Sequence, residues 1–401
     1  MKVFISRRDF LKVSGVAAAA AALAGCSSSG SGSTGGKTVK IGVFEPASGD
    51  NGAGGKQEVL GIEYANSVAP TVEIGGESYP VELVGVDTQS STDRAFPAAQ
   101  ELVSKKVSVV LGSYGSGVSI AAAPTFQSAS IPAIGCSGTT PAVTEANPYY
   151  FRVCFLDPFQ GSVMANFAKD EFGAGNAYVL SMLGEDYGSG LATYFVNAFE
   201  DLGGTVTSEQ FPEGTSDFSA YIQNAINAGA DVIFAPCATT YAAQIITQAA
   251  SAGFDKPITA GDTWESNVIL DAQKGTSVQV YCSTFFDEND DSGAAKEFVA
   301  GFKAWLNADS QKLTNNGGND IVAAVSALGY DAYMTALEAI KAAGSTDGTA
   351  IKDALYKVDY DGVTGSITFD QTTGDANKDM AYIKKASDGA FAFVKTQSVE
   401  G

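Results

Sequence analysis

Residues 107–117 read VSVVLGSYGSG. The first five form a nearly continuous apolar run, which is typical of a strand buried on both faces of a parallel sheet. The next six are small or hydroxyl-bearing, and they lead into a helix that we expect to begin near Gly117. A strand, a small-residue loop and a helix in this order predict one unit of a parallel α/β sheet.

The same alternation of strand and helix runs along the rest of the chain. The strand Thr38–Phe44 precedes a helix expected from about Gly61 to Ala69, and Gly75-Gly76 between Val72–Ile74 and Val81–Val86 predicts a hairpin turn. Further strands are expected at 131–134, 177–182, 205–211, 232–235 and 258–260, and helices at 190–202, 218–228 and 240–252. The pattern predicts the α/β class, and the chain is long enough for two lobes with separate parallel sheets.

The first residues carry a pattern typical of an export signal. Arg7-Arg8 is followed by Phe-Leu-Lys and then by an apolar, alanine-rich run over 13–24, which is too short to span a bilayer. Paired arginines in this position are typical of a twin-arginine signal, so we expect residues 1–25 to be a signal peptide.

The end of this signal resembles a bacterial lipobox. Leu23-Ala24-Gly25-Cys26 places a cysteine directly after small residues, which predicts that Cys26 is lipidated. Residues 26–37 would then be a lipid-anchored tether, because they are almost entirely Ser, Gly and Thr after the cysteine. The alternative is a short buried helix with an incidental cysteine. We expect an extracytoplasmic protein anchored to the outer face of the cytoplasmic membrane.

Charge and composition exclude several kinds of function. The formal net charge is −21, which argues against nucleic acid as a partner and against docking on anionic lipid headgroups. The sequence has no histidine, which removes Ser-His-Asp catalysis and zinc sites built on histidine. Enzymes that use only carboxylates remain possible, so the class of enzymes is weakened rather than eliminated.

The cysteines and one glycine-rich stretch give no sign of a metal or cofactor. If Cys26 carries lipid, four cysteines remain in apolar stretches, which favours buried thiols over disulfides: Cys136, Cys154, Cys237 and Cys282. Residues 52–57 are similar to the end of a phosphate-binding loop, whose motif would start at residue 50. However, Asp50 stands where the motif requires its first glycine, and Gln57 stands where it requires Ser or Thr. We therefore expect no cofactor and no metal.

The loops that follow the expected strands are rich in small and hydroxyl residues. They come after Phe44, Leu111, Ile134, Met182, Ala235 and Ala260. Ligands of parallel sheets bind beyond the carboxyl ends of the strands, and a helix start favours a carboxylate, so Ser116 is a candidate carboxylate donor. Asp262 offers a negative charge for an ammonium group. Tyr187 and Trp264 offer aromatic walls, and we interpret Glu265 as a solvated neighbour.

From about Lys37 to the end, the chain resembles type I periplasmic binding proteins of the branched-chain (Leu/Ile/Val) amino-acid group. The motifs that carry the resemblance are Ser48-Gly49, Gly112-Ser113, Thr139-Thr140-Pro141, Asp186-Tyr187-Gly188, Gly261-Asp262, Tyr330-Asp331-Ala332, and Phe369-Asp370 before Gly374-Asp375. The resemblance implies a protein without catalytic residues, which captures a small amino-acid-like ligand and delivers it to the permease of an ABC importer.

The resemblance also implies the ligand-binding residues and the lobes. The ligand contacts would be Ser116, Ser137, Thr139, Tyr187, Asp262, Thr263 and Tyr330. The two lobes would be joined by three crossings and comprise residues 38–156 plus 284–378 and residues 157–283 plus 379–401. Two aromatic contacts of leucine binders are replaced, near Gly54-Gly55 and near Ala238, so the particular amino acid stays open.

Three alternatives remain at this stage. A binding protein for urea or a short-chain amide would share the fold, but its site would not need groups that hold both an ammonium and a carboxylate. A ligand-sensing receptor component is a second alternative. Such a receptor should carry a transmembrane helix, but no apolar run of 18 residues follows the signal. A secreted hydrolase that uses paired carboxylates, such as Asp262 with Glu185 or Asp186, is the third.

Overall fold

The computed structural model describes residues 38–291 and 293–398, whose strands form two large sheets and one small hairpin. The first sheet has the order β2-β3-β1-β4-β5-β6, and the second has the order β15-β14-β11-β10-β9-β7-β8. The strands of the first sheet are β1 (Val39–Glu45), β2 (Thr71–Ile74), β3 (Glu77–Asp87), β4 (Val109–Leu111), β5 (Ala133–Gly135) and β6 (Tyr150–Arg152). Those of the second are β7 (Asn176–Met182), β8 (Thr205–Phe211), β9 (Val232–Phe234), β10 (Ile258–Ala260), β11 (Val280–Thr284), β14 (Ala381–Ser387) and β15 (Ala390–Gln397).

Most strand pairs are parallel, as the alternating pattern predicted. β1 pairs in parallel with β3 and β4, and β7 pairs in parallel with β8 and β9. In the two large sheets the exceptions lie toward the edges: β2 is antiparallel to β3, and β14 is antiparallel to both β11 and β15. The predicted hairpin is confirmed, because Ile74 pairs with Glu77 across the Gly75-Gly76 turn. The α/β class with two parallel-sheet lobes is therefore correct.

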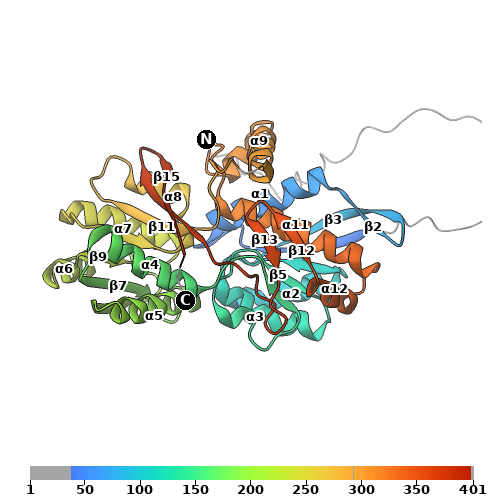
Figure 1. The fold of residues 1–401 in the computed structure, drawn as a ribbon, viewed down its shortest axis with the longest axis horizontal. Helices are drawn as coiled ribbons and strands as arrows, with labels where there is room; N and C mark the ends of the chain where they lie inside the picture. The colour runs from blue at the N-terminus through green and yellow to red at the C-terminus, as the bar shows by residue number, and fades with distance from the viewer. Residues whose placement is uncertain (1–37, 292, 399–401) are drawn as a thin grey trace, which may run out of the picture. The chain divides into compact units, whose positions relative to one another are not determined.

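Helices cover both sheets (Figure 1). Those near the first sheet are α1 (Gly52–Val68), α2 (Thr92–Ser104), α3 (Ser116–Ser128), α9 (Gly293–Asn307), α10 (Ser310–Asn315), α11 (Ala324–Ala343) and α12 (Gly348–Leu355). Those of the second sheet are α4 (Asp157–Phe172), α5 (Asp186–Asp201), α6 (Ser219–Asn227), α7 (Thr239–Ala252) and α8 (Asn267–Gln273). Short 3₁₀ helices occupy Pro141–Val143 and Asp262–Trp264, and β12 (Asp359–Gly362) pairs with β13 (Gly365–Thr368).

Helix α1 begins at Gly52, nine residues before the predicted start near Gly61. Its first turn contains glycines that helix propensity alone argues against. Two of them are required by packing: a Cβ at Gly54 would lie 2.4 Å from the Tyr114 ring, and a Cβ at Gly55 would lie 2.2 Å from the carbonyl oxygen of Pro46. The glycines are therefore explained by the close approach of neighbouring loops to the start of the helix. Because glycine has low helix propensity, the sequence did not predict that the helix begins here.

The chain passes between the two sheets three times: between β6 and β7, between β11 and α9, and between β13 and β14. Phe155 on the first of these segments packs against Phe285 on the second, with ring centroids 4.3 Å apart. Both side chains belong to a hydrophobic cluster that includes Val43 beside the first sheet and Phe195 beside the second. The first two connecting segments are thus packed against each other and do not run as separate loops.

Three further predictions concern the cysteines, membrane-spanning helices and the first residues, and the expectation of buried thiols is confirmed. Cys136, Cys154, Cys237 and Cys282 are buried free thiols. Within the described ranges, no helix has the length and apolar character needed to cross a membrane. Arg7, Arg8, Cys26 and the tether 26–37 lie outside the described residues.

Candidate ligand-binding site

A cavity of about 400 Å³ lies among loops that belong to both sheets, and we call it the cleft cavity. Its walls on the first-sheet side are Gly49, Asp50, Asn51, Gln89, Ser90, Ser91, Thr92, Asp93, Tyr114, Gly115, Ser116, Gly117 and Val118. Its walls on the second-sheet side are Met182, Gly184, Glu185, Asp186, Tyr187, Glu213, Ala238, Tyr241 and Thr263. The lining contains five acidic residues and, among the described residues, no Lys or Arg, so its field favours a ligand with a cationic group.

The loop between β4 and α3 supplies the first-sheet wall. Ser116 is the first residue of the thirteen-residue helix α3, and it is buried at the edge of the cavity. The first N–H groups of a helix have no partner within that helix, and together with the helix dipole they favour an anion. The Ser116 hydroxyl also lies 3.5 Å from the backbone N–H of Thr140, which donates to it. This helix start can therefore receive a carboxylate.

The loop after β5 is folded around a buried guanidinium. Arg152 donates from Nη1 to the carbonyl oxygens of Gly138 (2.8 Å) and Thr140 (2.9 Å), and from Nη2 to the Thr144 hydroxyl (2.8 Å). Its Nε donates to Asp375 Oδ1 at 2.5 Å, which balances the charge. Because the guanidinium is planar and its donors have fixed directions, these bonds fix the path of the loop.

Ser137 and Thr139 lie in this loop but do not line the cleft cavity. The Ser137 hydroxyl donates to Glu58 Oε2 at 2.5 Å and so points toward helix α1. The Thr139 carbonyl accepts the backbone N–H of Asp157 at 3.0 Å. Burial raises the pKa of the Asp157 carboxyl to about 7, although the Thr140 hydroxyl donates to it. Both predicted residues are buried, and neither lines the cleft cavity.

Asp262 is the acid of the second-sheet side, and only 3% of it is exposed. Its Oδ1 accepts hydrogen bonds from Gln160 Nε2 (2.8 Å) and from the hydroxyl of Tyr187 (3.1 Å). The Tyr187 hydroxyl also lies 3.3 Å from the Thr263 hydroxyl, and both of these residues line the cavity. The structure therefore brings three predicted residues together, with Asp262 directly behind the wall.

Asp262 forms no ion pair with the described residues. Burial raises the pKa of its carboxyl to about 6, while the hydrogen bonds from Gln160 and Tyr187 hold the rise back. At neutral pH the group is therefore mostly ionised. Within residues 38–291 and 293–398, no Lys or Arg forms an ion pair with it. A buried carboxylate with only neutral donors is a site that a ligand cation would stabilise.

Glu265 was interpreted as a solvated neighbour, and that interpretation is wrong. Its side chain is buried, and its Oε1 pairs with Lys384 Nζ at 2.5 Å. Its Oε2 accepts the Thr284 hydroxyl (2.6 Å) and the backbone N–H of Ala324 at the start of α11 (3.1 Å). Burial alone would lower the pKa of Lys384, but Glu265 outweighs this and raises it above its ordinary value. Glu265 therefore ties β11, β14 and α11 together.

Two aromatic predictions also need correction. Trp264 was expected to form a wall of the site, but it is fully buried, and its Nε1 donates to the carbonyl oxygen of Cys237 at 3.2 Å. Tyr330 was expected to border the cleft, but its ring packs against Tyr64 and Phe298 at centroid distances of 5.9 Å and 5.0 Å, and it does not line the cleft cavity. Both residues belong to the packing of their lobes.

The sequence reasoning missed several residues of the site. Tyr114 lines the cavity within the very loop that gave Ser116, so the same position after a strand was the available signal. Tyr241 donates to Asp50 Oδ2 at 3.3 Å and so joins helix α7 to the loop after β1 across the cavity. Gln160 belongs to α4, a helix that was not expected because its sequence shows only weak helical periodicity.

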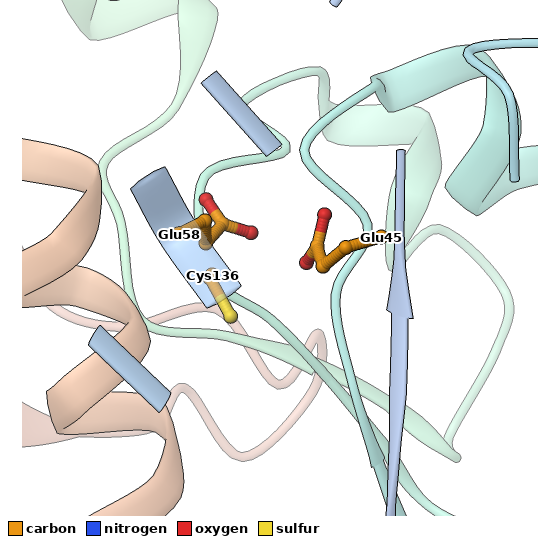
Figure 2. Close-up of side chains that lie close together, drawn as sticks. All are labelled: Glu45, Glu58 and Cys136. Carbon is orange, nitrogen blue, oxygen red and sulfur yellow. The ribbon is translucent and has the colours of Figure 1, made fainter. Parts of the chain in front are cut away.

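One group of described side chains has donor atoms close enough to consider for a metal. Atoms of Glu45, Glu58 and Cys136 all lie within 4.8 Å of one another, and all three residues are buried (Figure 2). Burial, and then the two carboxyl groups, raise the pKa of the Cys136 thiol well above its usual range. Without a bound metal ion the thiol therefore stays protonated. The two carboxyl groups beside it are close enough to share a proton.

Comparison with protein families gives two matches. A family model described as periplasmic binding protein matches residues 38–390. A model of twin-arginine translocation signal sequences matches residues 5–24.

Individual proteins show the same relationship. Leu/Ile/Val-binding protein homolog 1 of Brucella abortus (strain 2308) is 28% identical over 369 residues, which is 89% of this chain and 93% of the relative. The crystal structure of a leucine-binding protein from Thermotoga maritima is 33% identical with a TM-score of 0.82, and the match covers 90% of this chain and 99% of that one. The substrate-binding protein LivJ of Streptococcus pneumoniae, in complex with isoleucine, is 28% identical with a TM-score of 0.79 and the same coverage.

A more distant structure shares the fold alone. A solute-binding protein from R. palustris in complex with 4-hydroxybenzoate is 22% identical, with a TM-score of 0.78 and coverage of 90% of this chain and 97% of that one. The fold itself therefore does not determine the ligand.

The burial of Glu265 leads to a test of stability. Glu265→Gln leaves the buried Lys384 ammonium with only Asp287, 3.7 Å away, so we expect the free energy of unfolding to fall by about 3 kcal/mol in urea denaturation. The matched control is Glu101→Gln, which removes the exposed ion pair to Lys105 and should cost less than about 1 kcal/mol. Equal losses for the two variants would contradict the assignment of Glu265 as a buried tie.

Proposed function

The chain belongs to the periplasmic binding protein family, as its ordered motifs predicted, and from this premise we propose that it captures an amino acid in the cleft cavity for an ABC importer. Members of this family are substrate-binding proteins of transport systems and are not enzymes. The signal match at residues 5–24 and the family together indicate export from the cytoplasm. The proposal concerns the ligand, the residues that hold it and the delivery to a permease.

The observation that carries the proposal is the buried, uncompensated charge of Asp262. It lies behind Tyr187 and Thr263, which line the cavity, and it has only neutral hydrogen-bond donors. An α-ammonium group would supply the missing positive charge. Urea and short-chain amides carry no such charge, so Asp262 favours an amino acid over these alternatives.

The opposite wall supplies the partner for an α-carboxylate. Ser116 opens helix α3, and Ser116, Gly117 and Val118 of its first turn line the cavity, where the first N–H groups of a helix lack partners within the helix. The two walls lie close together at this point, because a Cβ placed on Gly117 would lie 2.7 Å from Asp186 Oδ2 of the second-sheet side. We propose Ser116 for the carboxylate, and Tyr187, Thr263 and Asp262 for the ammonium.

The ligand class follows from the relatives and the walls together. The Thermotoga maritima protein is a leucine-binding protein, and the Streptococcus pneumoniae protein holds isoleucine. Tyr114, Val118 and Met182 offer apolar contact in the cavity of this chain. We therefore propose a branched-chain or other small amino acid. Ser137 and Thr139 would act by shaping the loop rather than by touching the ligand.

Two further proposals concern the organisation of the chain. Cys26 follows Leu23-Ala24-Gly25 directly after the signal match, which supports a lipid anchor on the outer face of the cytoplasmic membrane. The lobes would comprise 38–156 plus 284–378 and 157–283 plus 379–401. The assignment of β1–β6 to one sheet and of β7–β11, β14 and β15 to the other supports this division.

The assignment of the two ends of the ligand can be tested with paired ligands. Asp262→Asn should weaken binding of the amino acid by about 10- to 100-fold, because a charge-assisted hydrogen bond in a buried site contributes about 1.5–3 kcal/mol. The same variant should bind the matching keto acid about as well as the wild type does. Ser116→Ala should weaken both ligands by about tenfold, because both carry the carboxylate. Isothermal titration calorimetry measures all four affinities.

Two results would count against these roles. Equal loss of amino acid and keto acid in Asp262→Asn would mean that the carboxylate of Asp262 does not pair with the amine. Unchanged binding in both variants would refute the proposal that Asp262 and Ser116 hold the ammonium and the carboxylate of the ligand, and it would favour an uncharged ligand.

The raised pKa of Asp262 predicts how affinity depends on pH. Its folded-state pKa of about 6 lies above the ordinary value of 3.8, and only the ionised carboxylate attracts an ammonium. Affinity should therefore be level above about pH 7 and should fall toward tenfold per pH unit below about pH 6, as protons compete with the ligand. Asp262→Asn should abolish this slope. If wild type and Asp262→Asn show the same slope, the pH dependence arises from another group. The neighbouring Asp157 is the first such group to examine.

A further inference from the structure

Two buried carboxyl groups face each other beneath the first-sheet wall of the cleft cavity (Figure 2). Glu45 is the last residue of β1, and Glu58 lies in the middle of α1. They are 2% and 0% exposed, so solvent does not separate their charges. The function proposed above gives neither of them a role.

One oxygen of each carboxyl holds a loop of the site. Glu45 Oε2 accepts the backbone N–H of Tyr114 at 2.7 Å. Glu58 Oε2 accepts the hydroxyl of Ser137 at 2.5 Å. Tyr114 lines the cavity in the loop after β4, and Ser137 lies in the loop after β5. The two carboxyls together therefore attach both loops to β1 and α1.

The other oxygen of each carboxyl lacks an N–H or O–H donor. Glu45 Oε1 and Glu58 Oε1 are both buried, and neither has an N–H or O–H donor within hydrogen-bond distance in the described part of the chain. The weak donor beside them is the Cys136 thiol, which lowers the pKa of Glu58 without overcoming the effect of burial. No Lys or Arg within the described ranges forms an ion pair with either residue. Two ionised carboxylates so placed repel each other, whereas a single proton between them turns the repulsion into a hydrogen bond.

We propose that Glu45 and Glu58 share one proton and act as a positioning pair, which holds the loops of Tyr114 and Ser137 in the geometry that receives the ligand. This inference rests on the proposed function for its effect on binding. The pair does not touch the ligand, because neither residue lines the cleft cavity.

The surroundings of the pair agree with this proton. Burial, and then the charge of Glu58, raise the pKa of Glu45 well above its ordinary value, and burial also raises that of Glu58. The titratable groups that act on the pair or feel its charge are Tyr114, Cys136, Tyr150, Cys154 and Asp262. All of these are neutral or acidic, so none of them supplies a positive charge to offset a second negative charge on the pair.

The sign of the pH effect follows from linkage. The unfolded chain releases protons from both carboxyls near their ordinary pKa, whereas the folded chain keeps one proton to higher pH. The folded state therefore loses stability relative to the unfolded state as pH rises above about 4.5, up to the folded-state pKa of the pair. At high pH, loss of the shared proton should also release the two loops and weaken binding.

Glutamine can replace the shared proton without changing the shape of the pair. In Glu45→Gln, the amide N–H can donate to Glu58 while the amide oxygen still accepts from Tyr114; Glu58→Gln offers the mirror arrangement. Each variant should bind the amino acid within about threefold of the wild type near neutral pH. Glu45→Leu leaves the N–H of Tyr114 without its acceptor, so it should weaken binding by about tenfold or more.

The decisive readout is the melting temperature of the full chain, with and without ligand, between about pH 5 and pH 9. The wild type should lose at least about 2 °C more across this range than either glutamine variant loses. The same pH slope in wild type and both variants would overturn the shared proton. Glutamine variants that fold but bind as poorly as Glu45→Leu, or that both fail to fold, would also overturn it. Absence of amino-acid binding by the wild type would refute the proposed function, while the melting slopes without ligand would still test the pair.

Discussion

Parallel pairing is the constraint from which the site follows, because parallel strands end at the same edge of their sheet. β1, β4 and β5 deliver their loops to one edge, and β7, β9 and β10 deliver theirs to the corresponding edge of the second sheet. The strand interiors are buried, so polar residues collect in these loops. A cavity lined by Tyr114 and Ser116 on one side and by Tyr187 and Thr263 on the other is the consequence.

Loops rich in glycine, serine and threonine have little stiffness of their own, and buried polar contacts supply it here. The Arg152 guanidinium fixes the loop after β5, and Glu265 with Lys384 fixes the segment after β10 to β14 and α11. Each of these charges has an opposite charge within the protein. Asp262 forms no ion pair with a Lys or Arg of the described residues, and this contrast is the main reason to propose that it stabilises a ligand cation from behind Tyr187 and Thr263.

The sequence predicted the parts of this structure that depend on local pattern. Apolar runs such as 107–111 predicted the strands. Because Ser116, Tyr187 and Asp262 follow the ends of such strands, they were predicted to lie around one cleft. The early start of α1 could not be predicted, because its glycines are explained by contacts with Tyr114 and Pro46 that only the folded chain contains. Glu265 and Trp264 were misread for the same reason, since their partners Lys384 and Cys237 lie far away in the sequence.

The central claim is that the cleft cavity binds an amino acid through its zwitterionic end. The most direct measurement is isothermal titration calorimetry of the purified protein against the standard amino acids, their keto acids, urea and short-chain amides. The account predicts saturable, equimolar binding of at least one amino acid, with the matching keto acid bound more weakly. Binding of urea, an amide or a keto acid with no binding of any amino acid would contradict it.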